Sequence, residues 1–141
     1  MSAFVDTGVF IAFANVKDRD HAAAEELVDR IRRGELGVPY TSDYVFDEVV
    51  TTALSRTGNP DLAVRAGSLI LGSPESSVKP LARLLRVDAA AFSDAWAAFR
   101  SKRSRGLSFT DQTTVALMRQ AGIDSLVSFD AGFDGIVRRV S

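Results

Sequence analysis

Apolar and polar positions along the chain follow two different periods, which predict strands separated by amphipathic helices. Short apolar runs predict strands at 3–6, 37–40 and 126–128, a further strand within 78–87, and a last edge strand at 136–140. Apolar residues at helical spacing predict helices at 21–33, 43–54, 61–72 and 89–99, and a last helix that begins after Ser108 or Thr110 and ends at 121. The apolar run at 9–14 fits either a buried helix or an extension of the first strand. Strands that alternate with helices are typical of an α/β fold, in which helices wrap a parallel sheet.

The composition is that of a soluble globular protein. Of the 141 residues, 46% are hydrophobic and 25% are charged, and no linker divides the chain, so we expect one domain over residues 1–141. Cysteine is absent, which excludes disulfides and thiolate metal sites and fits a cytoplasmic protein. No apolar run approaches the ~18 residues of a membrane span, and the start lacks a signal-peptide pattern, so we expect no membrane association.

Four acidic residues stand at or near the ends of the predicted elements. Asp6 closes the first strand, Glu48 lies on the helix after the second, Asp111 is in the first turn of the last helix, and Asp130 follows the strand at 126–128. Ligands of parallel sheets bind outside the carboxyl ends of the strands. If the four carboxylates meet there, their repulsion favours a hard divalent cation such as Mg2+ or Mn2+, and such ions serve phosphodiester chemistry.

Each acid also has a simpler explanation that the sequence leaves open. Asp6 and Asp130 suit turns after strands, and Glu48 suits a solvated helix face. Asp111 would stabilise a helix N-terminus by ~0.3 to 1 kcal/mol without any metal. For Asp134, in the same FDAGFD segment as Asp130, a turn role is favoured.

A basic segment, RSKRSRG, precedes the last helix. Its cations Arg100, Lys102, Arg103 and Arg105 have two interpretations. They suit a solvated helix C-terminus, where positive charge is favourable. They also suit phosphate contacts to RNA, which would supply affinity without sequence selectivity. The net charge of −1 gives the chain as a whole no attraction for nucleic acid, so RNA binding would depend on such local clusters.

Three aromatic residues share one face of the helix that precedes this segment. Phe92, Trp96 and Phe99 recur at helical spacing. We expect them to belong to the core rather than to form a base-stacking surface.

Four segments in order, FVDTGVFIA, DYVFDEVVTTAL, LSFTDQTTVALMRQAGID and LVSFDAGFD, make the chain resemble the PIN-domain nucleases, in particular the VapC-like toxins of type II toxin–antitoxin systems. The resemblance spans nearly the whole chain. It implies a three-layer α/β/α fold with a central parallel sheet of four to five strands. It also implies Mg2+ dependence, with Mn2+ as a substitute, and endonuclease activity on RNA.

The resemblance also implies roles for particular residues. Asp6, Glu48, Asp111 and Asp130 match the family's acidic site, with Asp6, Asp111 and Asp130 as metal ligands. Three further residues are expected to assist: Thr7, Thr110 and Asp134, of which Asp134 could substitute for Asp130. A cognate antitoxin and a homodimer are the expected partners, and the helix pair at 43–72 is the candidate surface for them. The alternative is a catalytically silent PIN-like scaffold that binds RNA or protein.

Overall fold

The computed structural model describes residues 1–101 and 106–141, which form five parallel strands and six α-helices. The strands are β1 (Ser2–Val5), β2 (Val38–Ser42), β3 (Arg83–Leu85), β4 (Ser125–Val127) and β5 (Arg139–Val140). The helices are α1 (Thr7–Ala14), α2 (His21–Arg32), α3 (Asp43–Thr57), α4 (Pro60–Leu71), α5 (Ala89–Phe99) and α6 (Phe109–Ala121). No helix in these two ranges is long and apolar enough to cross a membrane.

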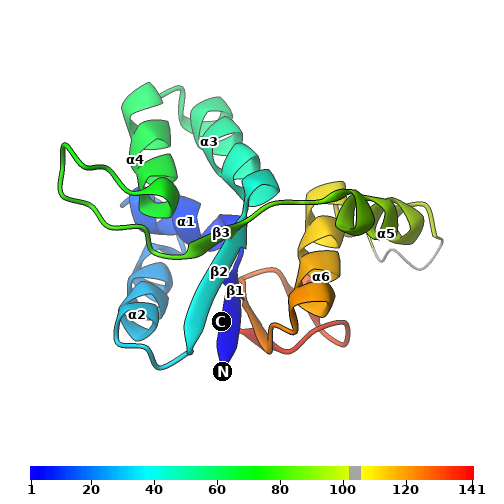
Figure 1. Cartoon of the computed structure of the whole chain (residues 1–141). Coiled ribbons are helices and arrows are strands. Elements are labelled where there is room, and N and C mark those ends of the chain that lie inside the picture. Colours follow the sequence, from blue (N-terminus) through cyan, green and yellow to red (C-terminus); the bar gives the residue numbers. More distant parts are fainter. Residues whose placement is uncertain (102–105) are drawn as a thin grey trace.

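The sheet has the order β3-β2-β1-β4-β5 with every pair parallel. Strand β1 is central, so that Phe4 lies opposite Tyr40 of β2 on one side and Leu126 of β4 on the other. Figure 1 shows α1 to α4 on one side of the sheet and α5 and α6 on the other. The predicted three-layer α/β/α fold is therefore confirmed, with five strands in the sheet.

The apolar runs form strands because both faces of the sheet are covered. Ala3, Phe4 and Val5 of β1 are fully buried, as expected for a central strand of a parallel sheet. Phe10 of α1 and Phe133 near the C-terminus are also fully buried and belong to the same core. Burying such a side chain contributes roughly 1.5–3 kcal/mol, which is why these short runs fix the sheet.

The carboxyl ends of the strands bring polar residues to one edge of the sheet. Asp6 follows β1 directly and caps α1, while Ser128 follows β4. Strand β2 runs two residues beyond the predicted end, to Ser42, whose hydroxyl accepts a hydrogen bond from the Val45 N–H at 3.1 Å and so caps α3. The transition from strand to helix is therefore immediate after both β1 and β2.

Helices α3 and α4, the helix pair expected at 43–72, form a hairpin. Gly58 ends α3 in the left-handed conformation, with φ 62°, and Asn59 caps α4. The two helices approach closely at Gly67, where an added Cβ would lie 2.9 Å from Val50 and 3.2 Å from Phe46. Glycine at this position is therefore what allows the hairpin to close.

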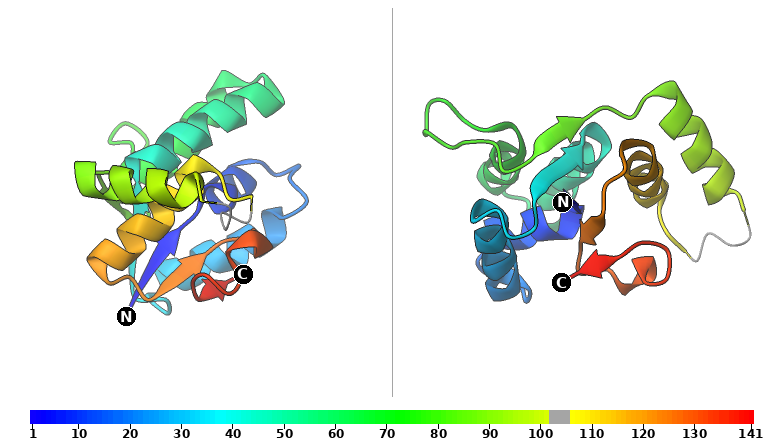
Figure 2. Two further views of the ribbon diagram at one scale, coloured as in Figure 1. Left: turned by 90° about the vertical axis from the view of Figure 1, so that its right-hand side faces the viewer. Right: turned by 60° about the horizontal axis from the view of Figure 1, so that its bottom comes forward.

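The expectation that the three aromatic residues of α5 belong to the core is wrong. Phe92, Trp96 and Phe99 remain 48%, 50% and 40% exposed, and we call them the aromatic face of α5. The buried residues of this helix are Ala91 and Ala95, and α5 packs on the outer side of α6 (Figures 1 and 2). Helical spacing predicted that the rings share a face, but not that only the small alanines of this helix become buried.

Candidate active site

The four predicted acids lie around one cleft at the carboxyl edge of the sheet. The cleft has a volume of about 530 Å3. Its lining consists of Asp6, Thr7, Gly8, Ile11, Asp18, Asp20, Glu48, Thr52, Arg56, Ser108, Asp111, Phe129 and Asp130. Residues from β1–α1, α3, α6 and the segment after β4 therefore meet at one place, as the strand-end argument predicts.

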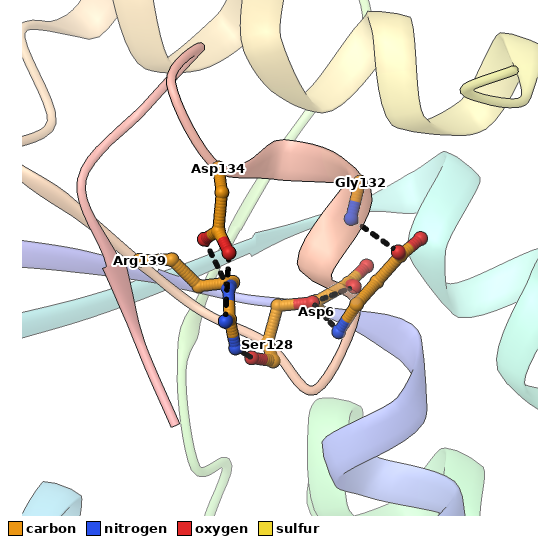
Figure 3. A network of polar contacts seen from close by, with 6 residues as sticks. Asp6, Ser128, Gly132, Asp134 and Arg139 are labelled. Carbon is orange, nitrogen blue, oxygen red and sulfur yellow. Dashed lines mark hydrogen bonds and ion pairs between the residues drawn. The ribbon is translucent and has the colours of Figure 1, made fainter. Parts of the chain in front are cut away.

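Asp6 lies on the floor of this cleft and is only 7% exposed. Its Oδ1 accepts a hydrogen bond from the Thr7 N–H at 2.8 Å, and this bond makes Asp6 the N-cap of α1. Its Oδ2 accepts one from the Ser128 hydroxyl at 2.6 Å (Figure 3). Each carboxylate oxygen is therefore held by one donor, and each keeps a further lone pair for another ligand.

The pKa of Asp6 is raised to about 7, mainly because burial penalises the charged form. The hydrogen bonds from Ser128 and Thr7 oppose this effect, whereas the negative charges of Asp111 and Glu48 reinforce it. A carboxyl group perturbed in this way inside a cleft is a candidate functional group on physical grounds.

Asp111 is held by a capping box at the start of α6. Its backbone N–H donates to the Ser108 hydroxyl at 3.0 Å, and its Oδ2 accepts from the Ser108 N–H at 2.8 Å. Burial raises the pKa of Asp111, and the charges of Glu48 and Asp130 raise it further. The capping role that the sequence left open is thus present, and the same carboxylate also faces the other acids.

Glu48 and Asp130 complete the set from two different sides. Glu48 is half-buried on α3, and Asp130 is exposed in the turn after β4. Asp130 is fixed by two local hydrogen bonds, one from the Gly132 N–H to its Oδ1 at 2.8 Å and one from its own N–H to the Ser128 hydroxyl at 3.0 Å. Ser128 therefore connects Asp6 and Asp130, the acids that follow β1 and β4.

The two predicted threonines differ in position. Thr7 lines the cleft and is 7% exposed, and its Oγ1 is buried without a hydrogen-bond partner. Thr110 is half-buried at the start of α6 and does not line the cleft. Buried hydroxyl groups normally have a partner, so the free Oγ1 of Thr7 marks a place where a ligand or water would be stabilised.

Asp134 lies outside the cleft lining and has a partner of its own. Its Oδ1 accepts a hydrogen bond from Arg139 Nε at 2.7 Å, and Arg139 Nη1 also donates to the Ser128 carbonyl at 3.1 Å (Figure 3). This ion pair lowers the pKa of Asp134. The geometry therefore favours Asp130 over Asp134 as the fourth acid.

The part of the predicted basic cluster that the structure describes does not line the cleft. Arg100 is exposed at the C-cap of α5 and does not line the cleft. Lys102, Arg103 and Arg105 lie outside the described residues. Their role in RNA binding stays a prediction.

Sequence reasoning missed several lining or supporting residues. Asp18 and Asp20 reach the cleft from the turn between α1 and α2, where the Asp20 N–H donates to Asp18 Oδ1 at 2.9 Å. Arg56 reaches it from the last turn of α3. Ser128 was available in the LVSFD segment, as a hydroxyl at a strand end beside an acid, whereas the others depend on tertiary packing.

The donors around the cleft suit a hard divalent cation. They are carboxylates and a free hydroxyl, without thiolates or imidazoles, which is the chemistry that Mg2+ and Mn2+ prefer. Across the described ranges, no three acidic or histidine side chains are grouped closely enough to hold an ion as they stand. The carboxylates therefore surround the cleft, and binding would require them to close on the ion.

The chain resembles known proteins over almost its whole length. Residues 3–138 match the model of the PIN domain family. The chain is 31% identical over 130 residues to the 23S rRNA-specific endonuclease VapC20 of Mycobacterium tuberculosis, a match that covers 92% of this chain and 90% of the relative.

Solved structures give the same picture of the fold. The crystal structure of M. tuberculosis VapC20, described as a sarcin–ricin loop cleaving toxin, has a TM-score of 0.77 at 29% identity, and the match covers 95% of this chain and 94% of that one. VapBC2 from Rickettsia felis bound to a DNA fragment from its promoter has a TM-score of 0.66 at 12% identity, and the match covers 99% of this chain and 98% of that one. FitAcB from Neisseria gonorrhoeae has a TM-score of 0.66 at 17% identity, and the match covers 99% of this chain and 96% of that one.

Proposed function

The chain belongs to the PIN domain family, and on this premise we propose that it is a Mg2+- or Mn2+-dependent endoribonuclease that acts as the toxin of a toxin–antitoxin pair. The observation that carries the proposal is Asp6, a carboxyl group buried on the floor of a cleft among other acids, with its pKa raised to about 7. Charged groups in such surroundings are costly unless an opposite charge joins them.

Asp6, Asp111 and Asp130 are the residues that would hold one or two ions, with Glu48 as a further ligand or acting through a water molecule. When bound, such an ion activates water for attack and neutralises charge on the phosphate. The hydrogen bonds from Ser128 and Ser108 orient the carboxylates of Asp6 and Asp111 before the set of acids closes on an ion. Asp6 must also release its proton, which makes activity rise with pH.

We propose RNA as the substrate and the 23S rRNA as the first target to test. The support is the 31% identity to a relative named for that specificity. The chain contains a single histidine, His21, which does not line the cleft. A route through the RNA 2′-hydroxyl would therefore lack the usual histidine acid–base pair, so hydrolysis by water is the favoured route. We also propose the cytoplasm as the location of the activity, because a ribosomal target is found there.

The test is cleavage of ribosomal and transfer RNA by the purified chain in Mg2+ or Mn2+, with EDTA and the Asp111→Asn variant as controls. The proposal predicts cleavage that both controls abolish and products with 5′-phosphate and 3′-hydroxyl ends. Products with cyclic phosphate ends, or cleavage that persists in EDTA, would contradict it. Metal binding without cleavage of any RNA would favour a silent binding scaffold.

We further propose an antitoxin partner and a homodimer, with the α3–α4 hairpin as the contact surface. An apolar groove of about 460 Å3 runs between these helices. Val64 and Leu71 on its margin are 65% and 53% exposed, and such apolar grooves suit an amphipathic helix. A solved protein of the same fold, from Klebsiella pneumoniae, is a toxin–antitoxin complex, which supports the antitoxin partner.

The contact surface is tested by charge substitutions in the groove. Val64→Asp and Leu71→Asp should each weaken dimer formation or antitoxin capture, measured by light scattering and by co-purification with the co-expressed antitoxin. RNA cleavage by the isolated variants should persist. Normal dimers and normal antitoxin capture in both variants would exclude this surface.

A further inference from the structure

One cation lines the otherwise acidic cleft. Six carboxylate residues line it: Asp6, Asp18, Asp20, Glu48, Asp111 and Asp130. Among the lining residues that the structure describes, Arg56 is the single basic one. The geometry points to Arg56 as a substrate-binding residue that holds a phosphate of the RNA strand next to the scissile one. This inference rests on the proposed nuclease function and adds a residue that the acid cluster alone does not indicate.

The position of Arg56 follows from the periodicity of α3. Glu48, Thr52 and Arg56 are separated by four residues each, so they lie on one face of the helix, and all three line the cleft. Eight residues along a helix correspond to about 12 Å. Glu48 therefore stands beside the other acids, whereas Arg56 stands at the far end of the same wall.

Arg56 is exposed and is not engaged by the chain's own acids. Over residues 1–101 and 106–141, no ion pair or side-chain hydrogen bond involves its guanidinium group. By contrast, Arg139 pairs with Asp134 and Arg33 with Glu35, each at 2.7 Å. An arginine in an acidic cleft that makes no internal pair remains available for an anion from outside.

The chemistry of the substrate requires such a group. RNA is a polyanion, and a cleft with six carboxylates repels it except where a cation intervenes. The acids would hold the scissile phosphate through a bound ion, but they cannot hold the neighbouring phosphates. A guanidinium group donates two parallel hydrogen bonds to a phosphate, which makes arginine well suited to this task.

A simpler explanation is that Arg56 only stabilises the C-terminus of α3, because cations are favourable in the last turn of a helix. Arg119 provides the matched control, since it is exposed in the last turn of α6 and does not line the cleft. A helix-end role predicts equal effects for Arg56→Ala and Arg119→Ala. A phosphate-binding role predicts an effect for Arg56→Ala alone.

The first measurement is steady-state cleavage of an RNA oligonucleotide that contains the sarcin–ricin loop sequence. Arg56→Ala should raise KM about tenfold, the size of one charge-assisted contact, and leave kcat within about twofold. The slope of log kcat/KM against log salt concentration should become shallower by about 0.7. Arg56→Lys should restore that slope because it keeps the charge, and Arg119→Ala should match the wild type.

The second measurement is binding of the same oligonucleotide, followed by fluorescence anisotropy in the Asp111→Asn background, so that it does not depend on cleavage. Weaker binding on adding Arg56→Ala, with no change on adding Arg119→Ala, supports the inference even if the wild type cuts no RNA. If Arg56→Ala leaves both cleavage and binding unchanged, the inference is overturned and the nuclease proposal stays intact. Loss of antitoxin capture with unchanged RNA binding would assign Arg56 to a protein contact and also overturn it.

Discussion

The acidic cleft and the aromatic face of α5 both depart from the usual distribution of polar and apolar residues, in opposite directions. In the cleft, Asp6 and Thr7 are each only 7% exposed although both are polar. On α5, Phe92, Trp96 and Phe99 are 40% to 50% exposed although all three are large and apolar. Buried polar groups and exposed apolar groups are the informative exceptions in a globular protein.

The two regions differ in how far their side chains find suitable partners within the chain itself. The aromatic rings contact one another, with Phe92 at 5.2 Å and Trp96 at 6.4 Å from the ring centre of Phe109, and Trp96 stacks on Phe99 at 6.0 Å. In the cleft, hydrogen bonds from Ser128 and Thr7 hold Asp6, yet its pKa stays raised and the Thr7 hydroxyl has no partner. The cost in the cleft is therefore electrostatic and should respond to pH and metal, whereas that on α5 should not.

The largest effect is expected from neutralising a cleft acid. Asp6→Asn or Asp111→Asn should lower RNA cleavage by more than about 100-fold, because even residues that only support metal ligands affect activity by 10- to 100-fold. Asp134→Asn is the matched control, since Asp134 pairs with Arg139 outside the cleft. Initial cleavage rates at saturating Mn2+ measure the effect. Equal losses in Asp111→Asn and Asp134→Asn would remove the distinction between the two positions.

The next effect is expected at Ser128, whose hydroxyl donates to Asp6 and accepts from the Asp130 N–H. Ser128→Ala should lower cleavage by about 10- to 100-fold and weaken the apparent affinity for Mn2+. Ser125→Ala, at the start of β4, is the control, because Ser125 donates to the Ser2 carbonyl, away from the cleft. An unchanged metal dependence in Ser128→Ala would show that this hydroxyl does not orient the acids.

A smaller effect is expected on how the free energy of unfolding depends on pH. The folded pKa of Asp6 is about 7 and its ordinary value is 3.8, so the folded state binds the proton more tightly than the unfolded state. Stability should therefore fall as pH rises from about 4 to about 7, by at most about 4 kcal/mol from this group. Asp6→Asn removes the penalty and should stabilise the metal-free protein at pH 8 by about 1 to 3 kcal/mol, but hardly at pH 4.

Urea unfolding in EDTA at the two pH values measures this difference. At pH 8, saturating Mn2+ should make the wild type more stable than Asp6→Asn, because the ion binds the folded wild type and not the variant. A wild-type stability that is independent of pH between 4 and 8 would contradict the electrostatic account of the cleft.

The smallest effect is expected on the aromatic face. Trp96→Ala should cost about 1 to 2 kcal/mol of unfolding free energy, with no dependence on pH or Mn2+, because half of the residue is already exposed. Phe133→Ala, at a fully buried ring, should cost about 3 to 5 kcal/mol. Urea unfolding compares the two variants. A cost for Trp96→Ala close to that of Phe133→Ala would show that the face is part of the core in solution.

The fold and much of the site were predictable because local patterns control them. Asp6 follows a buried strand, and Asp111 sits in a capping box, so periodicity and cap chemistry place both at element ends. Parallel pairing then brings those ends to one edge of the sheet. The approach of Asp18 and Arg56 was not predictable, because it depends on the turn after α1 and on the angle at which α3 leaves the sheet.

The error at α5 has a similar origin. Periodicity identifies which residues share a helix face, but not which neighbouring element covers that face. Here Ala91 and Ala95 are buried, whereas the larger rings at 92, 96 and 99 contact Phe109 at the start of α6 and stay about half exposed. A mostly apolar helix on the outside of a fold is thus a case in which sequence patterns misjudge burial.

The most direct test of the account is a Mn2+ titration of the wild type, Asp6→Asn and Asp134→Asn at pH 8, with free Mn2+ followed by electron paramagnetic resonance. The account predicts saturable binding to the wild type and to Asp134→Asn, and loss of that binding in Asp6→Asn. Binding that survives Asp6→Asn, or that Asp134→Asn abolishes equally, would contradict the claim that the cleft acids form the metal site.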